Sequence, residues 1–332
     1  DSITRFLSFK AFCTHGFLID SDLAIINMLN EAKRRVLAEA DLDGVFGQEQ
    51  TIRQVKSALL TGRHIILVGQ PGIGKTTLVK AIVEALPSDD ETPYVRVQGS
   101  PDLTPEDLIG DIDPVKALEY GPMSPEAFTP GKLFKADGGV LFFDEVNRSS
   151  GKLQNALLQA LEEQKATIGA YDVDLDADFL FIGTMNPEEN ATEHLSDVFL
   201  DRFDLVYMEP PEALSTESAI VEDSGEDLVD FPQPLLNALL TFIRSLRDED
   251  DLEKHPSVRA SIGVYERSQS NAFLDGRDMV SEDDIRKALT SVLAHRIRLK
   301  PSVRYAQDPE DFLDERFSEH LENVAGEQGS NP

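Results

Sequence analysis

A glycine-rich stretch between an apolar run and a helical run is the feature that most constrains this fold. Residues 64–68 read HIILV, residues 69–76 read GQPGIGKT, and TTLVKAIVEAL continues from Thr76. The stretch matches the spacing G-x-x-x-x-G-K-[ST], which arises by chance in about 1% of chains of this length. A buried strand, a glycine loop and a helix in this order would direct backbone N–H groups toward phosphate oxygens. A purely structural glycine turn is the alternative.

The loop therefore predicts a nucleotide site. We expect Lys75 to reach the β- and γ-phosphates and the Thr76 hydroxyl to ligate Mg²⁺. The other predicted nucleotide contacts come from the loop and the first helical turn: Gly69, Gln70, Pro71, Gly72, Ile73, Gly74 and Thr77.

A pair of acidic residues follows a second apolar run, in GGVLFFDEVNR at 138–148. Two acids after a strand are most often a helix cap or a solvated turn. When such a pair occurs in a chain that also carries a phosphate-binding loop, a catalytic role is favoured over a cap or a turn. We expect Asp144 to hold Mg²⁺ through its water shell and Glu145 to polarise the attacking water as general base.

Five short apolar runs alternate with helical stretches and predict an α/β fold with a parallel sheet covered on both faces. The runs lie at 64–68, 94–98, 140–143, 179–183 and 204–208. The longer connections at 111–135 and 164–178 predict hairpin inserts.

Three domains follow from the change in pattern along the chain. We expect a helical lead-in at 1–46, the α/β core at 47–211 and a small helical domain with a frayed acidic tail at 212–332, with no convincing strand in the last. In that helical domain, Ser281 and Asp284 have the spacing of a capping box.

The chain is strongly acidic, with 61 Asp and Glu against 31 Lys and Arg and a formal charge of −30. Such self-repulsion loosens a fold at low salt, whereas molar salt screens it over about 3 Å. The excess is typical of a halophile, and an ordinary acidic cytosolic protein is the alternative. The same charge opposes binding to nucleic acid.

The remaining composition points to a reducing, cytoplasmic setting. Cys13 is the single cysteine, so no intrachain disulfide or cysteine zinc cluster is expected. No apolar run approaches the roughly 18 residues that span a bilayer, and we expect no membrane partner. His64, His194 and His295 are better explained by packing than by a metal site.

Several segments together resemble an AAA+ ATPase over nearly the whole chain. They are the glycine loop, VLFFDEVNR, FLFIGTMNP, LSDVFLDRFD and HPSVRAS. Within AAA+ proteins the chain resembles the group formed by MoxR-like proteins and the ATPase subunit of magnesium chelatase. GDIDPVKALEYGP and FTPGKLFKADGG are similar to the chelatase subunit, whereas DEVNRSSGKLQNALLQALEEQ and GRDMVSEDDIRKALTSVLAHRI are similar to MoxR. The resemblance implies a five-stranded parallel P-loop sheet followed by an all-α lid.

The resemblance also implies roles for residues that spacing alone would not select. Asn186 matches the sensor that contacts the attacking water or γ-phosphate, although a turn cap before Pro187 would also explain it. Arg202 matches the arginine finger that acts in trans on a neighbouring subunit, although a surface ion pair with Asp201 would explain it too. Arg259 matches the second sensor on the lid, in PSVRA where relatives carry an SPRA-type string.

Further implied features concern the adenine, the inserts and the assembly. Gln48 matches the segment near the adenine, and an ordinary polar residue at a helix start explains it equally well. The two inserts would line the face or pore of a ring. A contact with a neighbouring subunit and an ordinary surface position both explain Arg148, and the surface position is favoured. Because the finger acts in trans, the resemblance implies a homo-oligomeric ring, with a hexamer expected.

The function implied is an ATPase that converts ATP and water to ADP and phosphate with Mg²⁺. A MoxR-type motor would remodel or mature a partner protein or metalloenzyme, commonly with a partner that carries a von Willebrand or integrin-type domain. The alternative is the ATPase subunit of a magnesium- or cobalt-chelatase-like complex. A nucleic-acid translocating motor and a nucleotide switch without turnover are further alternatives.

Overall fold

The computed structural model describes residues 31–86, 94–122, 124–163, 165–168, 171–174, 179–187 and 195–329. Most of the predicted lead-in, including Cys13, lies outside the described residues, as does His194. The part of the lead-in that is described holds the helix α3 (Glu31–Glu39).

The centre of the molecule is a five-stranded sheet in the order β2-β5-β8-β1-β9. Neighbouring strands are parallel throughout. In β1, which lies between β8 and β9, Ile65 pairs with Ile182 on one side and with Asp204 on the other. The strands are β1 (Ile65–Val68), β2 (Tyr94–Gln98), β5 (Val140–Asp144), β8 (Leu180–Met185) and β9 (Asp204–Tyr207). All five predicted runs are confirmed as strands of one parallel sheet.

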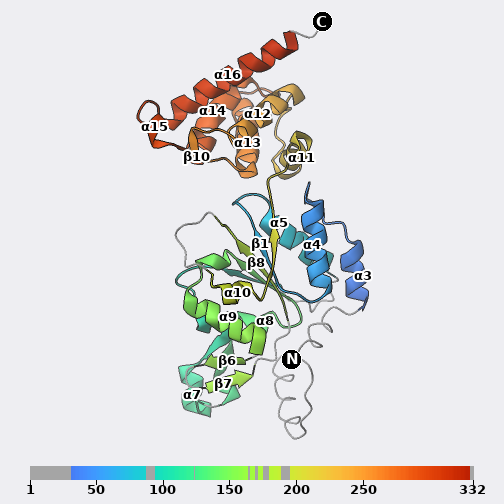
Figure 1. Cartoon of the computed structure of the whole chain (residues 1–332), viewed down its shortest axis with the longest axis vertical. Coiled ribbons are helices and arrows are strands. Elements are labelled where there is room, and N and C mark those ends of the chain that lie inside the picture. Colours follow the sequence, from blue (N-terminus) through green and yellow to red (C-terminus); the bar gives the residue numbers. More distant parts are fainter. Residues whose placement is uncertain are drawn as a thin grey trace.

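Helices cover both faces of this sheet. Consecutive strand residues point to opposite faces, so alternate residues of β1 pack against different helices. Ile65 and Leu67 pack with one group of helices, and Ile66 and Val68 pack with the other. The first group is α3, α4 (Glu49–Leu60) and α5 (Lys75–Ala85). The second group is α6 (Pro105–Ile109), α8 (Lys132–Lys135), α9 (Gly151–Glu163) and α10 (Asp197–Leu200). Figure 1 shows α4 and α5 on one side of the sheet and α9 and α10 on the other.

Two antiparallel hairpins project from the core at the end farthest from the C-terminal helices (Figure 1). The first joins β3 (Gly110–Ile112) to β4 (Phe128–Pro130) through α7 (Pro114–Tyr120) and a short 3-10 helix, η2 (Pro125–Ala127). The second pairs β6 (Lys165–Ile168) with β7 (Tyr171–Asp174). Each lies where the sequence predicts an insert.

The C-terminal part is helical and has its own apolar core, which includes Leu239, Phe242, Val264, Leu289 and Phe317. Its helices are α11 (Leu214–Ser224), α12 (Gln233–Ser245), α13 (Val258–Leu274), α14 (Glu282–Leu293), α15 (Pro301–Arg304) and α16 (Pro309–Gly329). A short antiparallel pair, β10 (Leu252–Lys254) with β11 (Arg298–Leu299), is an addition that the sequence did not predict.

The capping box at the start of α14 is confirmed. Asp284 Oδ2 accepts hydrogen bonds from the Ser281 N–H at 2.9 Å and from the Ser281 hydroxyl at 2.6 Å. Within the residues that the structure describes, no helix has both the length and the apolar character that a bilayer crossing requires.

Candidate active site

A cleft of about 490 Å³ lies between the carboxyl ends of the sheet strands and the first helices of the C-terminal part. Parallel α/β sheets bind ligands at this edge. The predicted site residues among its lining are Gln48, Pro71, Gly72, Ile73, Gly74, Lys75, Thr76, Thr77, Asp144, Glu145, Asn186 and Arg259. Residues from distant parts of the sequence therefore meet at one place.

The glycine loop follows β1 and leads directly into α5, as its spacing predicts. Gly72 and Gly74 have φ values of 83° and 96°, which side chains rarely tolerate. A Cβ at Gly72 would lie 2.7 Å from Ser257 Oγ and 3.1 Å from Arg259 Cβ, so the loop packs closely against the start of α13. Gly74 caps α5 without a side-chain hydrogen bond, which leaves the positive end of the helix facing the cleft.

Lys75 occupies the first position of α5 and turns back onto the loop. Its Nζ donates hydrogen bonds to Gly69 O at 2.6 Å and to Gln70 O at 2.8 Å. Gly69 and Gln70 themselves are outside the cleft lining. Burial lowers the pKa of Lys75 to about 8, while the charges of Asp144 and Glu145 oppose the shift and Arg259 adds to it.

Thr184 on β8 holds the two acidic residues at the end of β5. Its buried hydroxyl donates to Asp144 Oδ1 at 2.6 Å and accepts from the Glu145 N–H at 2.9 Å. On its other side, Asp144 Oδ2 accepts from Arg96 Nη2 at 2.5 Å. The carboxylate of Asp144 is therefore fixed from two neighbouring strands, β8 and β2.

Glu145 sits in a strained turn. Its φ of 56° is the one positive value among non-glycine residues in the described part of the chain. A Cβ at Gly99 would lie 2.0 Å from Glu145 O, so only glycine fits opposite this turn. Glu145 Oε2 accepts from Gln98 Nε2 at 2.8 Å and pairs with Arg148 Nη1 at 3.0 Å. Strain at such a position is common at functional sites.

Three other predicted residues also line the cleft. The Asn186 backbone carbonyl accepts from Asn147 Nδ2 at 3.1 Å. Arg259 lies in the first turn of α13 and lines the cleft from the C-terminal helical part of the molecule. Gln48 Nε2 donates to Glu209 O at 2.8 Å, which ties the start of α4 to the chain after β9.

Arg202 is not among the residues that line the cleft. It follows α10, where its Nη1 contacts Val198 O at 3.3 Å and Asp201 Oδ2 at 3.4 Å. The ion pair that the sequence offers as an alternative explanation is thus present. The structure brings the other catalytic candidates together but places Arg202 elsewhere.

The structure also adds residues that sequence reasoning missed. Arg96 interrupts the apolar pattern of YVRVQ, and Thr184 is a polar residue at the end of a buried run, so both carried a detectable signal. The apolar part of the cleft had no such signal, because its residues come from separate segments. It includes Phe46, Met208, Ile220 and Ile262.

The cleft fits a nucleotide with Mg²⁺. The Thr76 hydroxyl and the Asp144 carboxylate supply the hard oxygen donors that Mg²⁺ prefers. Lys75, Arg259 and the α5 N-terminus offer positive charge for phosphates, and the apolar residues offer a surface for a base.

His64 lies in an aromatic cluster with Phe179, Phe181 and Phe203. Over the described ranges, no group of three or more His, Cys, Asp or Glu side chains is placed to hold a metal ion.

Two family models match the chain, and together they cover more than half of it. The model for the ATPase family associated with various cellular activities (AAA) matches residues 64–205. The model for the AAA lid domain matches residues 245–316.

Named relatives and solved structures agree with these models. The chain is 27% identical over 288 residues to "Chaperone MoxR1" of Mycobacterium tuberculosis, covering 77% of this chain and 73% of that protein. It is 27% identical over 297 residues to "Magnesium-chelatase subunit ChlI, chloroplastic" of Glycine max, covering 71% and 69%. In fold it is similar to a RuvB point mutant of Thermotoga maritima, with a TM-score of 0.51, 20% identity and coverage of 76% and 73%.

The fold and the family models agree. The structure has a parallel sheet with a glycine loop at its carboxyl edge and a helical C-terminal part, and the two models match these two parts of the chain. The chain belongs to the AAA+ ATPases, with an AAA core and an AAA lid domain, and is related to proteins named MoxR and to magnesium-chelatase subunit ChlI.

Proposed function

We propose that the chain hydrolyses ATP as one subunit of a MoxR-type ring motor that remodels or matures a partner protein. The observation that carries the proposal is the division of the catalytic candidates. Lys75, Asp144 and Glu145 line one cleft, whereas Arg202 lies outside it. An arginine outside the cleft of its own chain is suited to complete the site of a neighbouring chain.

Within one chain, the contacts support a role for each residue. Glu145 is the general base, held by Gln98 and Arg148. Asp144 is held by Thr184 and Arg96, and its carboxylate would help to hold Mg²⁺. Lys75 can exchange its two carbonyl contacts for phosphate oxygens. Bound Mg²⁺ would neutralise charge on the phosphates.

The lid and the neighbouring subunit contribute the remaining charges. Arg259 reaches the γ-phosphate from α13, and Asn186 orients the water. Arg202 of the next subunit stabilises negative charge on the transferring phosphoryl group. The proposed assembly is a closed ring in the cytoplasm, with six subunits expected, that works with a partner carrying a von Willebrand or integrin-type domain.

The test is ATP hydrolysis in molar KCl as a function of protein concentration. We expect turnover per chain to rise with concentration and to fail in Arg202→Ala and in Lys75→Ala. An equimolar mixture of the two variants should regain activity, because some interfaces then combine an intact Lys75 with an intact Arg202. Turnover that is independent of concentration and survives Arg202→Ala would contradict the shared site.

A chelatase-like role is the second candidate, favoured by the match to subunit ChlI over 71% of the chain. The same motor would then drive insertion of magnesium or cobalt by separate subunits. Purification of the chain's stable complex distinguishes the two. A von Willebrand-domain protein without a metal-inserting subunit favours remodelling, and a large chelatase-like subunit favours metal insertion.

A further inference from the structure

A fully buried carboxylate, Glu217 on α11, lies in the lid and is not among the residues that line the cleft. It accepts hydrogen bonds from three side chains. Arg247 donates through Nη1 at 2.8 Å and Nη2 at 2.6 Å, Arg244 donates through Nη1 at 3.0 Å, and the Ser261 hydroxyl donates at 2.6 Å. Burial alone would raise the pKa of Glu217, but these partners outweigh it and lower the pKa, so the group is ionised.

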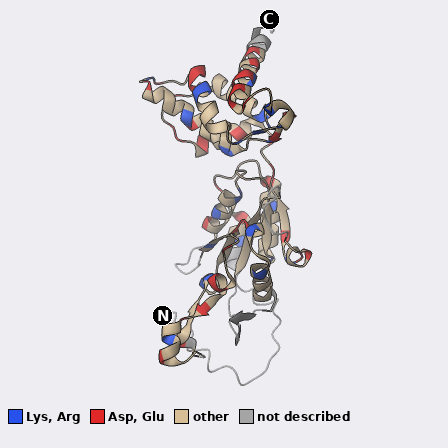
Figure 2. Ribbon diagram, turned by 90° about the vertical axis from the view of Figure 1, so that its left-hand side faces the viewer, with Lys and Arg blue, Asp and Glu red and all other residues tan. Residues whose placement is uncertain are grey.

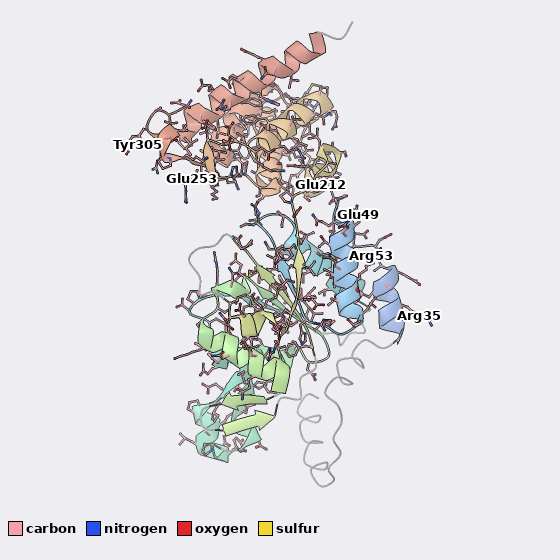
Figure 3. The ribbon with its side chains drawn as sticks, in the orientation of Figure 1. Arg35, Glu49, Arg53, Glu212, Glu253 and Tyr305 are labelled. Carbon is pink, nitrogen blue, oxygen red and sulfur yellow. The ribbon has the colours of Figure 1, made fainter. Side chains whose placement is uncertain are left out.

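Arg244 extends from Glu217 to the chain that connects the core with the lid. Arg244 Nη1 donates to Pro211 O at 2.9 Å, and its Nη2 donates to Glu212 O. Figure 3 labels Glu212 where the chain passes from the sheet to the lid helices. Because both carbonyls are bound, this connection is fixed against α12.

The same cluster also holds the segment that carries Arg259. Arg247 Nε donates to Pro256 O at 3.1 Å, and Ser261 contacts Glu217 directly. Arg259 lies between these two anchored positions, and its Cβ lies close to Gly72 of the glycine loop. One carboxylate therefore links the connecting segment to the turn that packs against the glycine loop.

We propose that Glu217, Arg244 and Arg247 form a positioning unit that sets where Arg259 stands over the γ-phosphate. This inference rests on the proposed function. Replacing a buried ion network by apolar residues of similar volume is often neutral or even stabilising. We therefore assign this network to the positioning of backbone segments and not to stability. The guanidinium groups bind carbonyls of the connecting segment and of the α13 start, which apolar side chains could not do.

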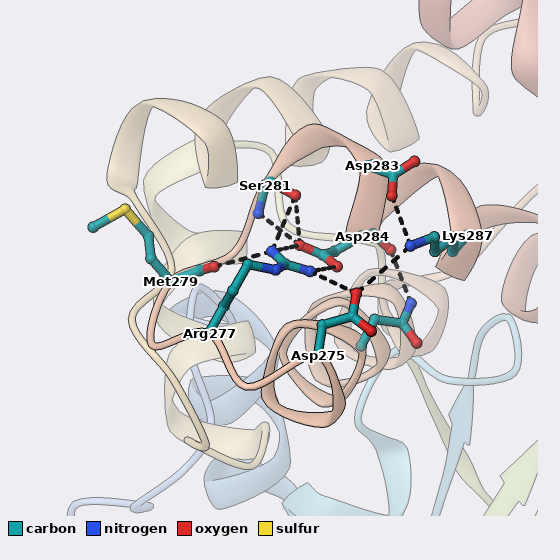
Figure 4. Close-up of polar contacts among 8 residues, drawn as sticks. Asp275, Arg277, Met279, Ser281, Asp283, Asp284 and Lys287 are labelled. Atoms are coloured by element: carbon teal, nitrogen blue, oxygen red, sulfur yellow. Dashed lines mark hydrogen bonds and ion pairs between the residues drawn. The ribbon is translucent and has the colours of Figure 1, made fainter.

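The lid contains a second buried ion pair that serves as a matched control. Asp284 is fully buried, and Arg277 binds it through two hydrogen bonds of 2.6 Å (Figure 4). This pair fixes the start of α14 and the far end of α13, where Asn271 Nδ2 donates to Asp284 O at 3.1 Å. None of these three residues lines the cleft.

The experiment compares Arg244→Met with Arg277→Met in the full chain. Each variant removes one partly buried guanidinium and leaves its carboxylate with other partners. The readout is the ratio of affinities for AMP-PNP and ADP, measured by calorimetry with Mg²⁺ in molar KCl. Only AMP-PNP carries a γ-phosphoryl group, so the ratio reports contacts to that group and not general loosening of the lid. The Arg259→Ala background then separates the contribution of Arg259 from that of the other residues at the γ-phosphate.

We expect Arg244→Met to lower the AMP-PNP to ADP ratio by about fivefold or more, within the usual range of coupling between sites. Arg277→Met should leave the ratio unchanged. Arg244→Lys, which keeps the charge and one carbonyl contact, should restore part of it. In an Arg259→Ala background, Arg244→Met should have no further effect on the ratio.

Glu217→Gln provides a second route, because it retains an acceptor for Ser261 while weakening both arginine contacts. Wild type that binds and hydrolyses ATP, with an unchanged ratio in Arg244→Met and Glu217→Gln, would overturn the inference and leave the proposed function standing. Wild type that binds neither nucleotide would contradict the proposed function and the inference together.

Discussion

At the scale of single residues, burial determines how Lys75 responds to pH. Its pKa is lowered to about 8, mainly by burial, and only its protonated form attracts phosphate strongly. We expect ADP affinity to be nearly constant below pH 7.5 and to fall as pH rises through 8, by up to about tenfold per pH unit. Calorimetry between pH 7 and 9.5 measures this.

Lys75→Arg is the control, because arginine stays charged over this range. Whatever the absolute ADP affinity of Lys75→Arg, the slope of that affinity against pH should be close to zero. Parallel slopes in wild type and Lys75→Arg would mean that another group is responsible.

Thr184 gives the second prediction at this scale. Thr184→Val keeps the shape of the side chain but leaves the Glu145 N–H without its acceptor and Asp144 Oδ1 without its donor. We expect a loss of about 1–3 kcal/mol in the free energy of unfolding and a large fall in kcat. Thr184→Ser, which keeps the hydroxyl, should retain most of the wild-type stability and most of the wild-type kcat. Denaturant unfolding and steady-state hydrolysis measure the two effects, and equal behaviour of Val and Ser would contradict the assignment.

At the scale of elements, the sheet could be predicted because each strand is a short apolar run, and both sides of β1 are buried. The glycine loop and the acidic pair were found for a similar reason, since local spacing determines them. The contacts of Arg96 and Thr184 could not be derived in this way. They depend on which strands are neighbours, and the order β2-β5-β8-β1-β9 is a property of the whole chain.

The same limit applies to the lid. Glu217, Arg244 and Ser261 lie on three helices, and nothing in the local pattern of any one of them predicts their meeting. The β10–β11 pair was missed because strands of three and two residues are too short to show alternation. Arg202 was recognised from the family pattern alone.

His64 gives a prediction that belongs to the sheet, because it joins the start of β1 to β8. Its Nδ1 accepts a hydrogen bond from the Phe181 N–H at 3.1 Å. Burial, with a smaller contribution from the charge of Arg63, lowers the pKa of His64 to about 4. Because the unfolded chain binds this proton more readily, stability is lost as pH falls from about 6.5 toward 4, by up to about 3 kcal/mol.

His64→Asn isolates this contribution, since an amide oxygen can accept from Phe181 and does not titrate. We expect the free energy of unfolding to fall more steeply in wild type than in His64→Asn between pH 6.5 and 4.5. Carboxylates titrate in both proteins and cancel in the difference. Identical pH profiles would show that His64 does not become protonated on unfolding.

At the scale of the whole molecule, the charge of −30 is spread over core and lid. Figure 2 shows acidic residues along the C-terminal helix as well as on the sheet domain. Several basic side chains are engaged in ion pairs, as Arg316 is with Glu249, Asp251 and Glu319. The excess acidic residues therefore repel one another, which favours the expanded chain at low ionic strength.

Raising KCl from 0.1 to 1 M shortens the screening length from about 10 Å to about 3 Å. We expect the melting temperature to rise by several degrees over this interval, because repulsion between exposed carboxylates is removed while buried pairs such as Glu217 with Arg247 are little affected. Calorimetry across the KCl series measures the change, with an equal-osmolality sucrose series to separate screening from solute exclusion. A melting temperature that stays flat in KCl would show that local ion pairs already compensate the charge, and the expected halophilic adaptation would be wrong.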